Sequence, residues 1–318
     1  SQQEHIVDKK FTVFVLGAGA MGAAYASRFY DYDPGVISFV ASGMRYERLK
    51  ADGVVVNDQP YPIQVLSPED SNPPADLILV ALKHHHLQGA LPDLKNFVNK
   101  KTILLSIMNG LDSEPVIASI YGEDKILYAT AVGIDAQRNG NVINYSKGGT
   151  IFFGEPDTSE LTQRVKDVQA IFDHAGIAYQ TPTDMVRIMW WKFMINVGIN
   201  QASVILRAPY GIFQTSPHAQ QIMESAMREV LSIAETAGVN LVEKDIREWY
   251  TFLNTLDPGG KTSMLQDIEA GRTSEVDIFA GKVIDLGRKY NLPTPVNELL
   301  FNAIKVIEQQ KRAESNLT

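Results

Sequence analysis

A glycine-rich stretch near the start of the chain, Gly17-Ala18-Gly19-Ala20-Met21-Gly22, is the feature that most constrains the fold. It follows an apolar, β-rich run at residues 11–16 and opens a segment of helical composition. In this setting the spacing G-x-G-x-x-G is typical of dinucleotide-binding domains: the first glycine permits a tight turn, the second admits a pyrophosphate, and the third lets the helix pack on the strand. Free N–H groups at the helix start, at Ala20 and Met21, would face the anion. A merely structural glycine turn is the alternative, but the setting favours a Rossmann domain with its cofactor on Gly17, Gly19, Ala20, Met21 and Gly22.

The rest of the first half continues to alternate strand-like runs with helix-compatible segments or loops. Such alternation predicts a mostly parallel, doubly wound sheet. The strand-like runs lie at residues 36–41, 54–56, 77–82, 102–107 and 126–132. Two further runs, at residues 142–145 and 150–153, flank Lys147-Gly148-Gly149 and predict a hairpin that extends this sheet.

The character of the sequence changes near Asp184, where long helical patterns begin to alternate with Pro and Gly breaks. These patterns lie at residues 186–206, 218–237 and 275–290. We therefore predict an α/β protein with an N-terminal Rossmann-type doubly wound sheet in residues 1–183, followed by an all-helical C-terminal domain in residues 184–318. The length of 318 residues suits two domains.

Composition excludes several classes of protein. Hydrophobic residues form 45% of the chain and charged residues 21%, as in ordinary globular proteins, and no apolar run is long enough to span a bilayer. The net charge of −8 argues against binding to nucleic acid or to anionic membranes. The absence of cysteine excludes disulfides, zinc–thiolate sites and cysteine nucleophiles. Because residues 1–10 lack an apolar signal-peptide core, we expect a cytoplasmic protein.

Two polar residues in the first half follow strand-like runs. Lys83 comes after residues 77–82 and Asn109 after residues 102–107, and open α/β sheets bind ligands at the carboxyl ends of their strands. A solvated lysine and a turn-forming Asn-Gly are equally open alternatives. The run His84-His85-His86 suggests a metal site, but adjacent residues seldom converge on one ion and no nearby carboxylate completes a set, so we expect no metal.

The second half contains a polar stripe on an otherwise apolar helix. Lys192, Asn196 and Asn200 recur every four residues, so their side chains would follow one face of an α-helix. Buried polar groups need partners, and an interhelical hydrogen-bond network with a snorkelling lysine would supply them. The alternative is a functional stripe, because a nicotinamide-binding domain needs a proton donor that faces its cleft.

Ser263 and Glu275 form a second candidate group. Ser263 to Gln266 reads as a capping box, and the segment from Ser274 to Asp277 starts the next helix in the same manner. Capping alone would explain both positions. A serine at a helix start can also donate to a carboxylate ligand, and a first-turn glutamate can accept from a substrate hydroxyl or from Lys192.

The expected cofactor is NADPH in preference to NADH. NAD-specific Rossmann domains usually place an acidic residue at the end of the second strand, about 20 residues past the glycine motif. No acid stands between Val36 and Arg45 in this chain. Ser42 and Arg45 could instead bind a 2′-phosphate, although Arg45 could also be a surface residue of the following helix.

With these residues assembled, the sequence resembles the ketopantoate reductases (2-dehydropantoate 2-reductases) over essentially its whole length. The resemblance is most specific at the glycine motif, the strand end at Lys83, Met108-Asn109-Gly110, the helix of Lys192, Asn196 and Asn200, and the blocks at 263–267 and 273–277. Two positions depart from the family: Tyr210 stands where an asparagine is common, and Ser42 where an arginine is common.

The resemblance implies roles for these residues. Lys192 would be the catalytic general acid, and Glu275 would position it or the substrate hydroxyl. Asn196, Asn200 and Ser263 would hold the substrate, with Asn109 and Lys83 beside the nicotinamide and the keto acid.

The implied reaction is the NADPH-dependent reduction of 2-dehydropantoate to pantoate, on the route to pantothenate and coenzyme A. Domain closure would exclude water from the reaction. A related two-domain hydroxyacid dehydrogenase and a non-catalytic NADP-binding sensor are the alternatives. The apolar helices near the C-terminus are compatible with a homodimer.

Overall fold

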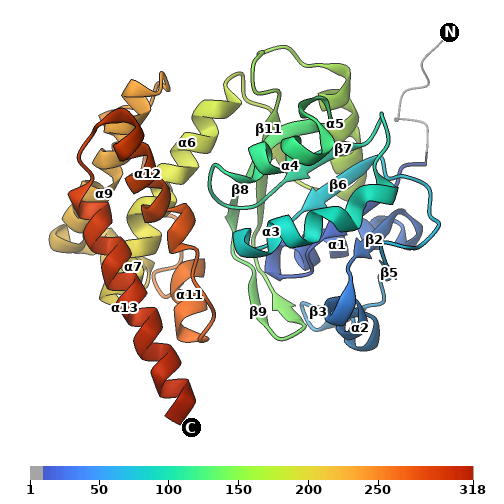
Figure 1. Cartoon of the computed structure of the whole chain (residues 1–318), viewed down its shortest axis with the longest axis horizontal. Helices are drawn as coiled ribbons and strands as arrows, with labels where there is room; N and C mark the ends of the chain where they lie inside the picture. The colour runs from blue at the N-terminus through green and yellow to red at the C-terminus, as the bar shows by residue number, and fades with distance from the viewer. Residues whose placement is uncertain (1–9, 318) are drawn as a thin grey trace. The chain divides into compact units, whose positions relative to one another are not determined.

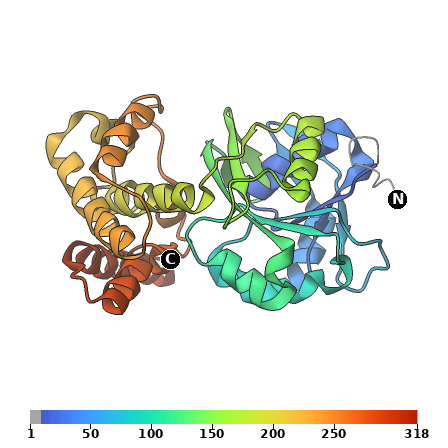
Figure 2. The ribbon, with the colours of Figure 1, turned by 90° about the horizontal axis from the view of Figure 1, so that it is seen from above.

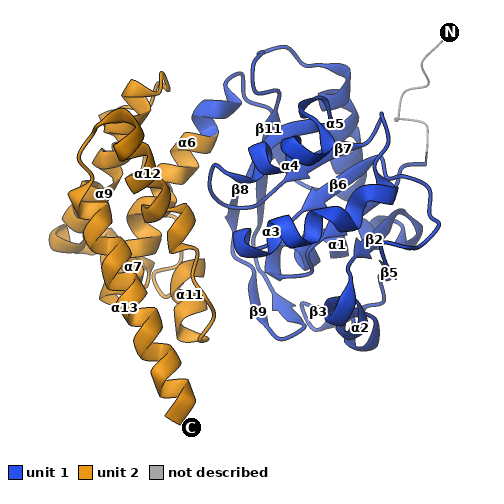
Figure 3. Ribbon diagram, in the orientation of Figure 1, with its two compact units in different colours: residues 1–188 blue, residues 189–318 orange. Residues whose placement is uncertain are grey.

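The computed structural model describes residues 10–317, which divide into two compact units (Figure 3). Unit 1 comprises residues 1–188 and unit 2 residues 189–318. The division falls inside helix α6 (Met185–Ile195), slightly beyond the boundary after residue 183 that the change in sequence character predicts. The polar opening segment, from which we argued against a signal peptide, lies outside the described residues up to residue 9.

An eight-stranded sheet forms the centre of unit 1 (Figure 1). Its order is β12-β11-β8-β7-β6-β1-β2-β5, in which β5, β2, β1, β6, β7 and β8 are parallel and β11 is antiparallel to β8. The chain runs outward from β1 in both directions, which is the doubly wound arrangement predicted from the sequence. The strands are β1 (Val13–Leu16), β2 (Ile37–Val40), β5 (Gln64–Leu66), β6 (Leu77–Val80), β7 (Ile103–Ser106), β8 (Ile126–Ile134), β11 (Gly148–Gly154) and β12 (Tyr179–Gln180).

Helices cover both faces of this sheet (Figure 2). Side chains of α1 (Ala20–Tyr32) and α5 (Gln163–Ala175) fill the core on one face, and those of α3 (His84–Ala90), η3 (Leu91–Phe97) and α4 (Ser113–Tyr121) fill the other. Every residue of β1, β2, β6 and β7 is buried, as expected for parallel strands covered on both faces. The remaining helices are α2 (Gly43–Asp52), η2 (Pro34–Val36) and η4 (Glu123–Lys125).

A second, four-stranded sheet of order β4-β3-β10-β9 corrects two predictions. The run at residues 54–56 is a strand, but it belongs to this small sheet, and β5 takes the place beside β2. The predicted hairpin is also wrong: β10 pairs with β9 and β3, whereas β11 pairs with β8. A tight turn at Gly140, with φ of +63°, closes β9 on β10 before the chain reaches Gly148. The strands are β3 (Val54–Val56), β4 (Gln59–Tyr61), β9 (Gln137–Asn139) and β10 (Val142–Asn144).

Unit 2 is all helical, as predicted. A π-helical turn, η5 (Asn196–Asn200), joins α6 to α7 (Gln201–Leu206). It packs closely on α9 at Gly198, where an added Cβ would lie 2.7 Å from the Met227 side chain. No helix among residues 10–317 is long and apolar enough to cross a membrane. The other helices are α8 (Tyr210–Thr215), α9 (Pro217–Thr236), α10 (Glu243–Leu253), α11 (Ser263–Glu269), η6 (Val276–Ile278), α12 (Ala280–Tyr290) and α13 (Pro295–Leu317).

Candidate functional site

The glycine motif of unit 1 forms a turn that larger residues could not adopt. Gly17 has a φ of +109°, and a Cβ there would lie 2.4 Å from the carbonyl oxygen of Ala81 at the end of β6. A Cβ at Gly22 would lie 1.9 Å from the carbonyl oxygen of Gly17. These two glycines therefore hold the end of β1, the end of β6 and helix α1 in close contact.

Gly19 differs from the other two glycines because space is open beside it. No described atom lies within 4 Å of a Cβ built there, and Gly19 is the N-cap of α1 without a side-chain hydrogen bond. The first helical residues, Ala20 and Met21, thus offer backbone N–H groups at an uncapped helix start with no acidic residue in its first turn. This open cradle of donors fits the pyrophosphate of a dinucleotide.

The topology brings Lys83 and Asn109 to the same edge as the glycine motif. Strand β6 lies between β1 and β7, and all three are parallel, so the loops after them emerge side by side. Lys83 is the N-cap of α3, and Asn109 is half-buried in the loop that follows β7. These positions are compatible with the sequence-based roles beside the nicotinamide.

A buried network that the sequence reading missed lies behind Asn109. The Ser106 and Ser113 hydroxyls are 2.7 Å apart, and Ser113 donates to Glu114 Oε2 at 3.0 Å. Ser106 Oγ also accepts from the backbone N–H of Met108 at 3.2 Å. Glu114 is only 1% exposed, its Oε1 has no partner in the described structure, and burial raises its pKa to about 7. Glu114 is the only charged residue of helix α4, and this was the available signal.

The end of β2 carries the residues predicted to bind a 2′-phosphate. Ser42 is the N-cap of α2, and its hydroxyl donates to Asp93 Oδ2 at 2.7 Å instead of capping the helix. Arg45 is exposed in the first turn of α2, and its charge helps burial lower the pKa of His86 to about 4. Asp93 therefore places a carboxylate at a strand end that has no acid in its local sequence.

The histidine run lies in the first turn of α3. The rings of His85 and His86 are tilted by 51° to one another, with centroids 4.0 Å apart. Within residues 10–317, no cluster of three or more histidine, aspartate or glutamate side chains is arranged to hold a metal.

The polar stripe of unit 2 coincides with the π-helical turn, whereas the sequence predicted a continuous α-helix. π-turns inside α-helices are frequent at functional sites. Asn200 Nδ2 donates to Asn196 Oδ1 at 3.2 Å, and Asn196 Nδ2 has no partner in the described structure although the residue is 3% exposed. Burial lowers the pKa of Lys192, one turn earlier, to about 8. This hydrogen bond lies within one helix, unlike the interhelical network that we considered as an alternative, and it leaves one buried amide donor unsatisfied in the described structure.

The predicted capping boxes at Ser263 and Ser274 are both wrong. Thr262 caps α11, because its hydroxyl accepts from Leu265 N at 3.2 Å and lies 2.6 Å from the Ser203 hydroxyl. Ser263 is consequently the first residue of α11, with an exposed side chain that makes no hydrogen bond to any described residue. Its hydroxyl is thus available to a ligand.

Glu275 is the N-cap residue of η6 and is 8% exposed. Its neighbour Ser274 does not form a capping box with Asp277, because Ser274 donates to Glu308 and Asp277 forms an ion pair with Lys305 at 3.1 Å. Contacts of Ser274 and Asp277 with α13 therefore anchor this segment on both sides of Glu275.

Two further residues shape this unit. Gln201 is fully buried and joins three elements: it donates to Val197 O and Asn297 Oδ1 and accepts from the N–H of Ala280 at 2.9 Å. Tyr210 stands at the position where the family commonly has asparagine. Its ring lies so close to Gly260 that a Cβ added to this glycine would be 3.1 Å from it, and burial raises the pKa of Tyr210 to about 12.

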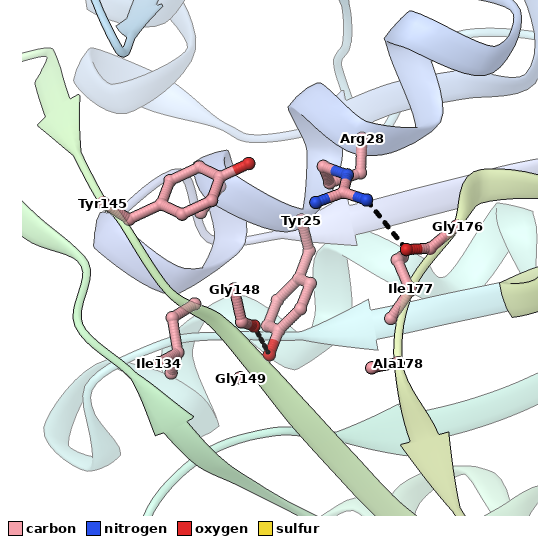
Figure 4. Close-up of a pocket in the computed structure, with 10 residues that line it drawn as sticks. Tyr25, Arg28, Ile134, Tyr145, Gly148, Gly149, Gly176, Ile177 and Ala178 are labelled. Atoms are coloured by element: carbon pink, nitrogen blue, oxygen red, sulfur yellow. Dashed lines mark hydrogen bonds between the residues drawn. The ribbon is translucent and has the colours of Figure 1, made fainter. Parts of the chain in front are cut away.

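A cavity of about 230 Å³ lies elsewhere in unit 1 (Figure 4). Tyr25 donates to Gly148 O at 3.1 Å and Arg28 donates to Gly176 O at 2.7 Å along its wall, and the Tyr145 ring points toward Arg28. None of the catalytic, substrate-binding or cofactor-binding residues predicted from the sequence lines this cavity.

Comparison with known proteins identifies the family. Residues 13–158 match the family "Ketopantoate reductase PanE/ApbA" and residues 184–308 match "Ketopantoate reductase PanE/ApbA C terminal". The chain belongs to the ketopantoate reductase family. The two matches take in the glycine motif in unit 1 and the helix of Lys192 in unit 2, so both halves of this family's architecture are present.

Individual relatives are distant but span more than nine-tenths of the chain. The 2-dehydropantoate 2-reductase of Aquifex aeolicus is 23% identical over 300 residues, 92% of this chain and 96% of that protein. A ternary structure of D-mandelate dehydrogenase with NADH and anilino(oxo)acetate has a TM-score of 0.85 at 18% identity, covering 95% of this chain and 100% of the other. A dimeric ketopantoate reductase from Staphylococcus aureus has a TM-score of 0.75 at 19% identity, covering 94% and 99%. These two structures share the fold of this chain.

Proposed function

We propose that this chain reduces a 2-keto acid with a nicotinamide dinucleotide, and that its substrate is 2-dehydropantoate, giving pantoate. The observation that carries the proposal is the π-helical turn, where the unsatisfied Asn196 amide follows a half-buried lysine with a lowered pKa on one helix. Buried polar groups without protein partners are costly, and a substrate's carboxylate and keto oxygens would satisfy them. The alternative of a purely structural stripe does not explain the free amide donor.

The chain's residues fit the chemistry of such a reduction. Backbone N–H groups at Gly19, Ala20 and Met21 would hold the pyrophosphate, with Lys83 and Asn109 beside the nicotinamide. The bound nucleotide supplies the hydride. Lys192 would donate the proton to the developing alkoxide, and its lowered pKa makes it a stronger acid than an ordinary lysine while it stays mostly protonated at neutral pH.

The remaining unit 2 residues would hold the substrate. The Asn196 and Asn200 amides and the Ser263 hydroxyl are donors suited to a carboxylate and a hydroxyl. Glu275 would accept from the substrate hydroxyl or orient Lys192. The expectation of NADPH as the reductant rests on Ser42 and Arg45 alone.

The test is an assay of reduced-nucleotide oxidation with purified full chain and a panel of 2-keto acids. Ketopantoate should give the highest kcat/KM, with benzoylformate, the keto acid related to mandelate, as the main competitor. A clear preference for another keto acid would make this a different hydroxyacid dehydrogenase. Nucleotide binding without turnover of any keto acid would instead support the sensor alternative.

We also propose a homodimer. The S. aureus relative is dimeric by its description, and α13 of this chain exposes Leu299 at 70% and Val306 at 50%. These two residues are seven positions apart, on one face of α13, and contiguous exposed apolar patches mark interaction sites. Analytical ultracentrifugation of the wild type and of a Leu299→Lys, Val306→Lys variant tests this, and a monomeric wild type would refute it.

A further inference from the structure

The end of β2 holds a carboxylate that the chain supplies from a distant segment. Ser42, two residues past the end of β2, donates its hydroxyl to Asp93 Oδ2 at 2.7 Å, across 51 residues of sequence. Asp93 lies in the first turn of η3. In Rossmann domains this strand end is where the ribose of the adenosine half is read.

Asp93 is held in place by the packing of its own helix. It is half-buried, and Leu91, Leu94 and Phe97 of η3 are completely buried beside it in the sequence. The Tyr121 hydroxyl of α4 bonds to the carbonyl of Leu91, and burial, together with the charge of Asp93, raises the pKa of Tyr121 to about 12. The carboxylate is therefore a fixed feature of this strand end.

The charge at this strand end disfavours a phosphate. No described lysine or arginine forms an ion pair with Asp93, so its negative charge is not neutralised by a contact within residues 10–317. The Ser42 hydroxyl, expected to donate to a 2′-phosphate, already donates to Asp93. Arg45 remains as an exposed cation on α2, and a 2′-phosphate bound there would face the carboxylate as well.

We propose that Asp93, oriented by Ser42, accepts hydrogen bonds from the adenosine ribose hydroxyls and makes this chain prefer NADH to NADPH. Asp93 Oδ1 accepts no hydrogen bond from the described residues, so one carboxylate oxygen is free for a ribose hydroxyl. Asp93 thus takes the place of the acid that NAD-specific domains carry at the strand end itself. This inference rests on the proposed nucleotide-dependent function and replaces the expectation of NADPH.

The test measures dissociation constants of NADH and NADPH by calorimetry, without substrate, on the full chain. The wild type should bind NADH more tightly. Asp93→Asn should shift the ratio of the two constants toward NADPH by about tenfold, because it removes a like charge that faces the phosphate. Asp58→Asn, which neutralises an exposed carboxylate in a turn of the same unit, is the matched control and should leave the ratio unchanged.

The possible failures are distinct. A wild type that prefers NADPH, or an Asp93→Asn ratio equal to that of the wild type, overturns the role of Asp93. A wild type that prefers NADPH and loses this preference in Arg45→Ala would support the Ser42 and Arg45 prediction in place of the role of Asp93. A protein that binds neither nucleotide overturns the proposed function itself, and the wild-type preference is measurable even if a variant fails to fold.

Discussion

The hydroxyls of Ser106 and Ser113 lie 2.7 Å apart and connect the end of β7 to the start of α4. Ser106 accepts from Met108 N, immediately before Asn109, and Ser113 donates to the buried Glu114. The loop that carries Asn109 is therefore fixed from behind by a chain of hydrogen bonds that ends at a carboxyl group. Because burial raises the pKa of Glu114, the protonation of the carboxyl group at the end of these hydrogen bonds depends on pH.

Glu114 should make the folded protein less stable as pH rises. Its folded pKa is about 7 against an ordinary value of 4.5, so the folded state holds the proton more tightly. The contribution of this proton to the free energy of unfolding is complete below about pH 4.5. It is lost as pH rises to about 7, a change of roughly 3 kcal/mol. Glu114→Gln mimics the neutral carboxyl and removes this dependence. Urea unfolding of both proteins across this range measures it, and a wild-type-minus-variant difference that is constant with pH would contradict it.

Lys192→Ala should lower kcat by roughly 10²- to 10⁴-fold while leaving nucleotide affinity nearly unchanged, because a positioned acid acts on the transition state. In the wild type, kcat should also fall as pH rises through about 8, where the lysine loses its proton. Lys192→Met, which preserves most of the packing volume, controls for a cavity. Near-normal turnover in either variant would leave Lys192 a structural residue.

Glu275→Ala should lower turnover and weaken ketopantoate binding, because this buried carboxylate is proposed to contact the substrate hydroxyl or Lys192. Glu275→Gln keeps the volume and separates the loss of charge from the loss of packing. Ser274→Ala is the matched control, since it removes the adjacent contact to Glu308 and should reduce only thermal stability. If Glu275→Ala lowers only the melting temperature, the residue has no part in the reaction.

The two glycines Gly19 and Gly22 should respond differently to alanine. Gly22→Ala places a Cβ 1.9 Å from the Gly17 carbonyl and should destabilise unit 1 by roughly 1–3 kcal/mol. Gly19→Ala meets no described atom and should leave the melting temperature nearly unchanged while it weakens nucleotide binding. Calorimetric binding and thermal melts distinguish the two effects. Equal nucleotide affinity of Gly19→Ala and wild type would show that no pyrophosphate approaches there.

The sequence by itself determined the features that depend on neighbouring residues. The glycine motif reveals the β1–α1 turn because a positive φ at Gly17 and close packing at Gly22 exclude other side chains there. Helical periodicity likewise identifies unit 2 as all helical. Lys192, Asn196 and Asn200 lie on one helix, as the sequence predicted. The π-helical turn was not predicted, because residues four apart lie on nearly the same side of an α-helix and of a π-helix, so their spacing does not distinguish the two.

Only the tertiary structure decided the pairings between distant segments. Ser42 meets Asp93 because η3 returns to the end of β2, and Thr262 rather than Ser263 caps α11, with its hydroxyl against Ser203, 59 residues away. Glu114 is buried because α4 packs its first turn against the sheet. Each of these contacts joins residues that are far apart in the sequence, and its hydrogen bonds and desolvation exist only once the chain has folded. Local sequence patterns therefore do not predict these contacts.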